Sequence, residues 1–455
     1  MVFCSHAMCI MKNCISLFGI VLFFVACEIK MEDNLGYTAI TKWQGDKQSA
    51  ISITYDDGTI NQFTVARPIM NKFGIPGTFY IITGKVNGSS KGKFIGRPND
   101  EIIKETASSN TNSDNFFERA SLIGFTGMNE AVEYHSKAGS LFESGKITEA
   151  HELMDEGYEH VRNHNLKSID QVVFHDNSVD TTTWEDYQAY VAEGHEIASH
   201  TVTHPRLAVL DEVNLLYELE QSKADIQKFL GEKYTFSAEC PYGTENQRVM
   251  EYAYKIYPAL RNRMPEPYLD ELNRSSKRPP GESEKEYVQW QRGPLNNVSM
   301  EVMKSWVDTC ITYNNIWLVL VFHGIDGIGW EPRTGEELEE YFNYMNERKA
   351  YLWIATFADV TKYIRERKNT EITSVVQEDN IVVNISSDLD PTVYDVPITL
   401  KTYVPSTWKT TVLNKKAKQE NRLRLKIKKD ALGFYVLYSV LPGDGEIILS
   451  EQLDK

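Results

Sequence analysis

The sequence predicts an α/β fold with parallel strands, followed by a small all-β domain. A strand at 50–55, a helix at 63–73 and a strand at 78–82 form a strand–helix–strand unit, whose length favours parallel pairing. Strand and helix patterns then alternate, after an interruption, as far as residue 367. From residue 371 the helical patterns end and short alternating strands separated by turn residues take over, which is typical of a β-sandwich.

The remaining elements of the α/β part follow from local signals. Gly74 ends the first helix, and Thr183 with Asp186 resembles a capping box at the start of a helix that stops at Gly194. A Pro-rich and charged stretch, 265–297, is expected to be a long loop. The other expected elements, in chain order, are a strand at 195–199, a helix at 211–230, a strand at 235–240, a helix at 246–257, a short strand at 259–261, a helix at 300–313, a strand at 317–322, a helix at 336–348, a strand at 351–355 and a helix at 357–367.

The 455 residues are enough for two or three domains. We expect a signal segment at 1–27, a polar tether at 28–47, an α/β domain at 48–368 and the C-terminal β domain at 371–455, with a mostly helical insertion at 86–180 inside the α/β domain. In the insertion, 130–142 and 146–161 are predicted to form a helical hairpin. Its histidines match no metal motif and are interpreted as ordinary core or surface residues.

The N-terminus resembles a bacterial lipoprotein signal. Lys12 precedes a mostly apolar run at 15–25 that is too short to span a bilayer, and the run leads into Ala26-Cys27. The pattern predicts lipidation of Cys27, with a signal cut without lipidation as the alternative. The acidic residues after Cys27 resemble the surface-export signals of Bacteroidetes lipoproteins. We therefore expect a protein of the bacterial cell envelope, anchored by lipid at the outer membrane or cell surface.

Charge and cysteine content exclude some classes of protein. The formal net charge of −16 leaves no basic excess to bind phosphates, which argues against nucleic acid as a partner and leaves the lipid anchor as the sole membrane contact. Beyond the signal, Cys27, Cys240 and Cys310 are too few for a disulfide framework. Nothing in the sequence sets an oligomeric state.

Two adjacent carboxylates and two histidines carry the expected chemistry. Asp56 and Asp57 follow the strand at 50–55, and Asp-Asp-Gly is a turn signal at the strand's carboxyl end. His200 and His204 follow the strand at 195–199, so they are expected at the same edge of the sheet. One Asp and two His make an N/N/O ligand set that leaves metal positions open, and the second Asp stays free as a base.

These residues resemble the motifs of the polysaccharide deacetylase family with the NodB-homology domain. Its first motif, Thr-Phe-Asp-Asp-Gly, is similar to residues 54–58, where Tyr55 replaces Phe, and its second, His-Ser/Thr-x-x-His, is met by His200, Thr201 and His204. The resemblance covers about 220 residues. It implies a distorted (β/α) barrel with fewer strands than eight, and metal-dependent removal of acetyl groups from a poly- or oligosaccharide as N- or O-deacetylation.

The resemblance also implies a role for each residue. Asp57, His200 and His204 would hold one divalent metal, with zinc preferred and cobalt, nickel or manganese as alternatives. Asp56 would be the general base and His323, after the strand at 317–322, the general acid. The backbone that follows Pro241-Tyr242 would stabilise the oxyanion, so the candidates for oxyanion or substrate binding are Tyr242 and Trp330.

The sequence departs from the family pattern at two places. The third motif normally carries an Arg that pairs with the base, but Glu239 stands there. We predict that Arg261, after the short strand at 259–261, supplies the missing cation; the alternative is that Arg261 is solvated and Glu239 points outward. The Asp that orients the catalytic His also has no matching pattern, and Asp270 and Asp326 are candidates. Two functions therefore remain, an active deacetylase and a catalytically impaired surface glycan-binding protein on the same barrel.

Overall fold

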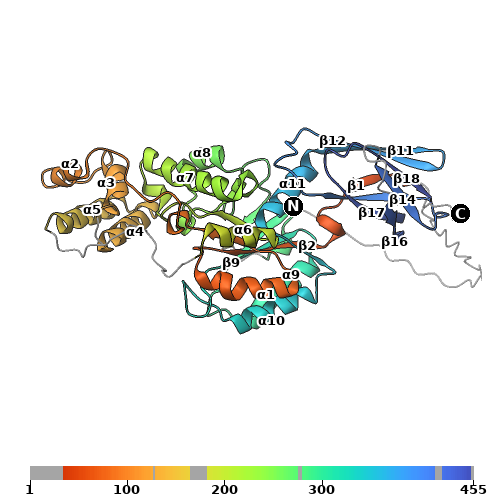
Figure 1. The fold of residues 1–455 in the computed structure, drawn as a ribbon, viewed down its shortest axis with the longest axis horizontal. Helices are drawn as coiled ribbons and strands as arrows, with labels where there is room; N and C mark the ends of the chain where they lie inside the picture. Colours follow the sequence, from red (N-terminus) through yellow and green to blue (C-terminus); the bar gives the residue numbers. More distant parts are fainter. Residues whose placement is uncertain (1–33, 127–128, 164–181, 275–278, 416–422, 452–455) are drawn as a thin grey trace, which may run out of the picture.

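The computed structural model describes residues 34–126, 129–163, 182–274, 279–415 and 423–451. Its α/β domain is built on a parallel sheet of nine strands in the order β6-β5-β4-β3-β2-β9-β8-β7, with β10 pairing the first half of β2. Figure 1 shows this curled sheet between two layers of helices. The predicted distorted (β/α) barrel is confirmed. The strands are β2 (Ser49–Tyr55), β3 (Thr78–Ile81), β4 (Glu196–Ser199), β5 (Ser237–Ala238), β6 (Ala259–Leu260), β7 (Leu272–Asn273), β8 (Val288–Arg292), β9 (Ile316–Phe322) and β10 (Leu352–Ile354).

The central strands β2 and β9 are buried on both faces. Ile51 and Ile53 pack into an apolar cluster with residues of the outer helices, whereas Ala50 and Trp317 pack with the last helix of the domain in a second cluster. Burial of both faces is the usual state of a parallel sheet and explains the nearly continuous apolar runs. The helices around the sheet are α1 (Arg67–Phe73), α6 (Trp184–Ala192), α7 (Glu212–Leu230), α8 (Gln247–Ile256), α9 (Met300–Thr312), α10 (Gly335–Asn346) and α11 (Phe357–Asn369).

Helix ends lie where the capping residues predict them. The predicted capping box between Thr183 and Asp186 is present at the start of α6. Asp211 and Asn246 cap α7 and α8 through their side chains, and Gly74 ends α1 in a left-handed conformation.

The expected stretch 265–297 is not only a loop. It contains β7 and β8, and β8 lies between β7 and β9 in the sheet. Val288 and Trp290 alternate with Gln289 and Gln291, and all four are buried. Both glutamine amides donate hydrogen bonds to the carbonyl of Arg261. The prediction of a loop failed because Gln289 and Gln291 make the strand look polar, and their hydrogen-bond partner is a backbone carbonyl that is distant in the sequence.

The helical insertion forms a separate cluster at the end of the molecule opposite the β domain (Figure 1). Its helices are α2 (Asn99–Glu105), α3 (Phe116–Ile123), α4 (Asn129–Glu143) and α5 (Ile147–Arg162). They share their own apolar core, which includes Phe116 and Met154. The buried His135 of α4 links this cluster to the barrel, because one ring nitrogen contacts the carbonyl of Ala120 and the other accepts from the amide of Arg206. Residues 164–181 of the predicted insertion lie outside the described residues.

The C-terminal part forms two antiparallel sheets around one apolar core. One sheet has the order β1-β13-β17-β16 and the other β11-β12-β18-β14-β15. The strands are β1 (Thr38–Ile40), β11 (Thr370–Gln377), β12 (Asn380–Ser387), β13 (Ile398–Val404), β14 (Thr411–Lys415), β15 (Leu423–Leu425), β16 (Lys428–Asp430), β17 (Gly433–Val440) and β18 (Glu446–Glu451). β11 follows α11 directly.

The predicted tether at 28–47 is wrong for its second half. β1 pairs with β13, and the buried Trp43 donates a hydrogen bond from its indole to the carbonyl of Asn314. A three-residue strand carries too weak a local pattern to be recognised, and here it is stabilised by a partner more than 350 residues away. Residues 1–33, which include Cys27, lie outside the described residues. Among the residues described, no helix is both long and apolar enough to cross a membrane.

Candidate metal centre and catalytic site

The turn after β2 sends its two carboxylates in different directions. The amide of Asp56 still bonds to the carbonyl of Phe322 at 3.0 Å, which continues the ladder between β2 and β9. Asp57 then takes a left-handed conformation, with φ of 74°, and Gly58 follows with φ of 66°. A left-handed residue is uncommon outside glycine, with Asp and Asn among the exceptions. The turn therefore places Asp56 and Asp57 side by side with separate partners.

Asp57, His200 and His204 converge, as the sequence predicts for the metal ligands. The Asp57 Oδ1 atom lies 3.3 Å from His204 Nε2 and 3.6 Å from His200 Nε2, and the two Nε2 atoms are 3.1 Å apart. All three residues are buried, and one ligand atom from each lies within 4.8 Å of the others. Within the described ranges, this is the one group of His, Cys, Asp or Glu residues that could hold a metal ion.

Neighbouring groups fix the orientation of the two histidines. His200 Nδ1 lies 2.9 Å from the Glu239 carbonyl, so Nδ1 carries the proton and Nε2 keeps its lone pair for a metal. Burial lowers the pKa of His200, against the charges of Asp56 and Asp57, which favours the neutral imidazole. The loop between the histidines is held by the buried Glu218, whose carboxylate accepts from the amides of residues 202 and 203.

Asp56 is held by Arg261 at the end of β6. The guanidinium forms two bonds to the carboxylate, Nη1 to Oδ1 at 2.5 Å and Nη2 to Oδ2 at 2.6 Å, and Nη1 also bonds to Thr54 Oγ1 at 2.9 Å. The structure thus brings together the two residues that sequence reasoning paired. Burial alone would raise the pKa of Asp56, but the charges of Arg261 and His323 outweigh burial and lower this pKa.

Glu239 points into the site and contacts Arg261, rather than pointing outward. Its Oε1 lies 3.0 Å from Arg261 Nη2 and also accepts from the Asn262 side chain. Burial raises the pKa of Glu239 well above its usual value, with the charges of Glu245 and Asp56 adding to the effect. Arg261 thus lies against both carboxyl groups, so the departure from the family pattern still leaves the base with a cation beside it.

His323 lies on the other side of Asp56, at the end of β9. Its Nε2 is 3.4 Å from Asp56 Oδ2, and its ring packs edge-on against Trp330 with centroids 4.8 Å apart. The side chain of Gln62 donates to the carbonyls of both Asp56 and His323 and so ties the two strand ends together. Sequence reasoning did not identify Gln62, because nothing in a helical polar residue signals this bridge.

The two aspartates considered for orienting His323 have other partners. Asp270 accepts from the amide of Tyr287 and contacts Lys368, and Asp326 accepts from the amide of Gly335. No hydrogen bond joins either carboxylate to His323 among the described residues. The candidates Asp270 and Asp326 are therefore withdrawn.

The candidate residues line one pocket with a volume of about 430 Å³. Tyr242, in a left-handed conformation with φ of 60°, packs edge-on against His204 with centroids 4.7 Å apart. The amides of Gly243 and Thr244 donate to carbonyls of their own turn, so they are not the expected oxyanion donors and the amide of Tyr242 takes their place as candidate. The pocket residues are Asp56, Asp57, His200, His204, Glu239, Tyr242, Gly243, Arg261, Arg274, Val321, His323 and Trp330.

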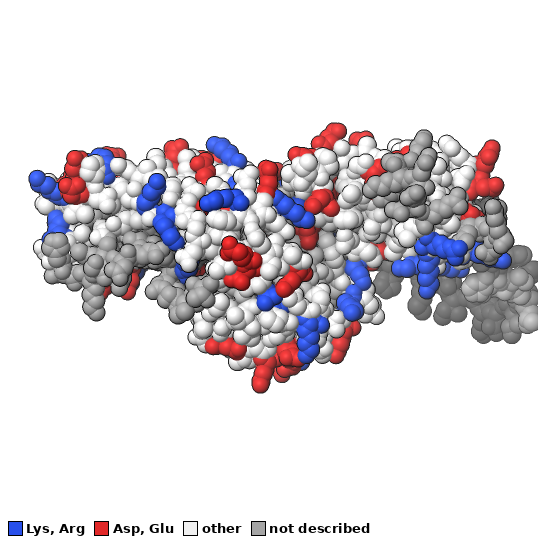
Figure 2. All heavy atoms as spheres, viewed as in Figure 1, with Lys and Arg blue, Asp and Glu red and all other residues white. Residues whose placement is uncertain are grey.

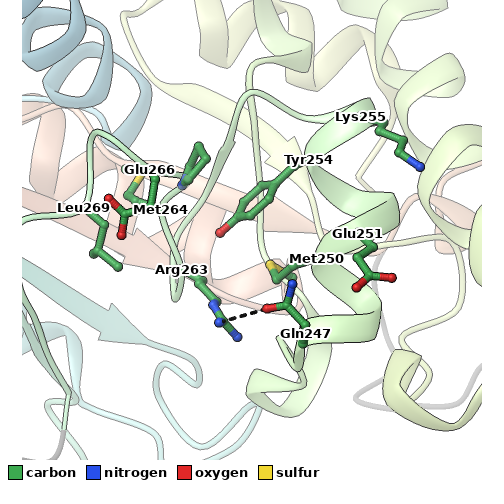
Figure 3. A pocket seen from close by; sticks show the side chains of 10 residues that line it. Gln247, Met250, Glu251, Tyr254, Lys255, Arg263, Met264, Glu266 and Leu269 are labelled. Carbon is green, nitrogen blue, oxygen red and sulfur yellow. Dashed lines mark hydrogen bonds between the residues drawn. The ribbon is translucent and has the colours of Figure 1, made fainter.

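A second pocket of about 470 Å³ lies beside α8 and holds none of the candidate catalytic residues (Figure 3). Figure 3 shows Arg263 at its edge, with its guanidinium directed to the side chain of Gln247. The Tyr254 ring extends from α8 into the space between them. This pocket is lined by Gln247, Met250, Glu251, Tyr254, Lys255, Arg263, Met264, Pro265, Glu266 and Leu269.

Comparison with known families matches residues 140–256 to the family described as polysaccharide deacetylase. Residues 140–256 are similar to this family, and the match covers less than half of the chain. The matched segment includes His200, His204 and Tyr242, whereas Asp56 and His323 lie outside it and are brought to the same pocket by the sheet.

The chain is similar to several known proteins. A gellan lyase from a Bacillus species is 28% identical over 242 residues, which cover 49% of this chain and 9% of that protein. The Xyl-CE4 domain of a multidomain xylanase, from the hindgut metagenome of Trinervitermes trinervoides, shows 12% identity over 68% of this chain and 88% of its own, with a TM-score of 0.31. A family 4 carbohydrate esterase from Streptomyces lividans, in complex with acetate, shows 10% identity over 68% of this chain and 92% of its own, with a TM-score of 0.31.

Proposed function

We propose that this chain is a metal-dependent hydrolase that removes acetyl groups from a poly- or oligosaccharide, either from nitrogen or from oxygen. One observation carries the proposal. A buried Asp-His-His cluster lies in the same pocket as a separate carboxylate, Asp56, which is itself held between Arg261 and His323. Ligands, base and acid therefore face one space large enough for a sugar unit.

The donor atoms fit a single divalent ion. Ligand atoms about 2.1 Å from one ion in tetrahedral geometry lie ~3.4 Å apart, and the three separations here are 3.1, 3.3 and 3.6 Å. Two imidazoles and one carboxylate suit zinc, and also cobalt, nickel or manganese. When bound, the ion would supply a Lewis acid that polarises the acetyl carbonyl and lowers the pKa of water.

The residues of the chain supply the proton transfers. Asp56, ionised beside Arg261, accepts the proton of the attacking water while the water oxygen bonds to the acetyl carbon. His323 gives a proton to the leaving nitrogen or oxygen as its bond to that carbon breaks, and the products are acetate and a free amine or hydroxyl. Tyr242 lines the pocket as the candidate for binding the developing oxyanion, and the half-exposed Trp330 lines it as a candidate contact for the sugar.

The catalytically impaired alternative rested on Glu239. The structure places a guanidinium against Asp56 from β6, so the cation that the family pattern supplies from another position is present. The observation that favoured a binding protein without catalysis is thereby accounted for, and we retain the enzyme.

The proposal is tested by measuring metal and acetate release together. Purified protein is stripped of metal, reloaded with Zn²⁺ or Co²⁺ and assayed on an acetylated aryl ester and on N-acetylated and O-acetylated oligosaccharides. We expect one ion per chain and acetate release that returns only with metal. His200→Ala should lose both, whereas His160→Ala, a histidine of the distant α5, should lose neither. A protein that never holds more than trace metal, or a His200→Ala variant that retains it, contradicts the proposal.

We also propose that the chain is lipid-anchored in the cell envelope through Cys27. The support is the sequence alone, in which Ala26-Cys27 closes an apolar run too short to span a bilayer. An envelope location matches an enzyme whose substrate is a glycan.

A further inference from the structure

Arg274 is an unsatisfied cation on the wall of the catalytic pocket. It follows β7, its side chain is 47% exposed, and it lines the same space as Asp56, His323 and Trp330. Within the described part of the chain its guanidinium donates no hydrogen bond. The acid that forms an ion pair with it among the described residues is Glu245, whose Oε2 lies 3.8 Å from Nη1, which is beyond hydrogen-bond distance; the charge of Arg274 also acts on Glu239 in the same pocket.

Glu245 is a weak partner for this cation. Its Oε1 already accepts a hydrogen bond from the Asn262 side chain. Burial raises the pKa of Glu245, although the charge of Arg274 opposes the effect, so the carboxyl is less charged than an exposed glutamate. Arg274 consequently retains donors that are free to meet a ligand.

The backbone leaves room for the guanidinium. A Cβ atom on Gly243 would lie 2.3 Å from Arg274 Nη2 and 3.0 Å from Cζ, so any larger residue there would displace the side chain. Gly243 also has a φ of 68°, which favours glycine. The turn that carries Tyr242 is therefore shaped to hold Arg274 against the pocket wall.

The other charged groups of the pocket are already compensated. Arg261 is bound to Asp56 and Glu239, and Asp57 contacts the two histidines. The chain as a whole has a formal net charge of −16, and Figure 2 shows acidic and basic side chains interspersed over the visible face of the barrel and insertion. An anionic ligand would find its specific attraction at Arg274, since the protein as a whole repels it.

We propose that Arg274 binds the carboxylate of an acidic sugar, so that the substrate is an acetylated glycan containing uronic acid units. The planar guanidinium matches a carboxylate through two parallel hydrogen bonds, and the partly exposed aromatic side chains of Tyr242 and Trp330 line the same pocket, where they can contact sugar rings. This inference rests on the proposed function for the identity of the reaction, but the binding of the acidic unit is separable from it.

The test is a binding measurement that needs no turnover. Zinc-loaded protein is titrated calorimetrically with oligosaccharides of glucuronic, galacturonic and mannuronic acid, with their carboxyl-reduced neutral counterparts, and with sulfated neutral oligosaccharides. Wild type should bind at least one acidic ligand about 10- to 100-fold more tightly than its reduced counterpart, which corresponds to one charge-assisted pair. Arg274→Met should reduce this ratio by about tenfold or more, and Arg274→Lys should restore part of it.

Arg263→Met is the matched control, because Arg263 belongs to the neighbouring pocket of Figure 3 and the substitution removes the same charge near the same segment. It should leave the ratio unchanged. Equal binding of acidic and reduced ligands by wild type, no binding of either, an equal loss in Arg263→Met, or a preference for the sulfated ligand overturns the inference. Acetate release is measured separately, so that acidic binding without acetate release refutes the proposed function and leaves the role of Arg274 intact.

Discussion

The pairing of Arg261 with Asp56 makes a prediction that separates proton transfer from metal binding. Arg261→Met removes two short bonds to the carboxylate, at 2.5 and 2.6 Å, in a site where both side chains are buried. An adjacent Arg typically lowers the pKa of an Asp by about 1–3 units, so its loss should raise the pKa of Asp56 by about that amount. Asp57, His200 and His204 contact one another, so metal content should remain.

The sign of the pH effect follows from the role of Asp56. The base works only when ionised, so a higher pKa moves the acidic limb of the rate profile to higher pH. At pH values below the pKa of Asp56 in both proteins, kcat/KM of Arg261→Met should be about 10- to 10³-fold lower than that of wild type, since each unit of pKa changes the ionised fraction of the base tenfold. The difference should shrink as the pH rises. Arg261→Lys, which keeps the charge but not the two parallel bonds, should lie between wild type and Arg261→Met.

The assay is kcat/KM for acetate release from pH 3 to pH 9, together with metal analysis and a thermal melt of each variant. The melt is needed because an uncompensated buried charge costs about 3–5 kcal/mol of stability. Arg263→Met is again the control. A folded, metal-loaded Arg261→Met variant whose acidic limb coincides with that of wild type would refute the reasoning.

Three further predictions follow from the same structure. Asp56→Asn and His323→Ala should each keep the metal and lose activity, with a loss of ~10²-fold or more for His323→Ala; unchanged kcat in either would remove that residue from the mechanism. Burial lowers the pKa of His135 to about 4, so the unfolded chain takes up a proton that the folded chain refuses. The free energy of unfolding should therefore fall by about 2 kcal/mol between pH 7.5 and pH 5, and urea titrations of His135→Gln should show a smaller fall. Wild type should incorporate labelled palmitate and fractionate with membranes, whereas Cys27→Ala should do neither; an unlabelled wild type contradicts the anchor.

Much of the fold was predictable because its signals are local. The apolar runs of β2 and β9, the capping box of Thr183 and Asp186 and the Asp-Asp-Gly turn each fix their structure within a few residues. Parallel strands place their carboxyl ends at one edge, so a turn after β2 and a loop after β4 had to bring their ligands together. The convergence of Asp57 with His200 and His204 is the geometric result.

Tertiary structure decided what depends on distant partners. The sequence by itself left open whether Arg261 and Glu239 face the site or solvent. In the fold both are buried beside Asp56, and burial raises the pKa of Glu239. Gln289 and Gln291 form a strand because a remote carbonyl satisfies them, and β1 exists because β13 pairs with it. Polar groups gain or lose free energy on burial according to partners that no local pattern reports, which is why the ligand set was predictable and its electrostatic surroundings were not.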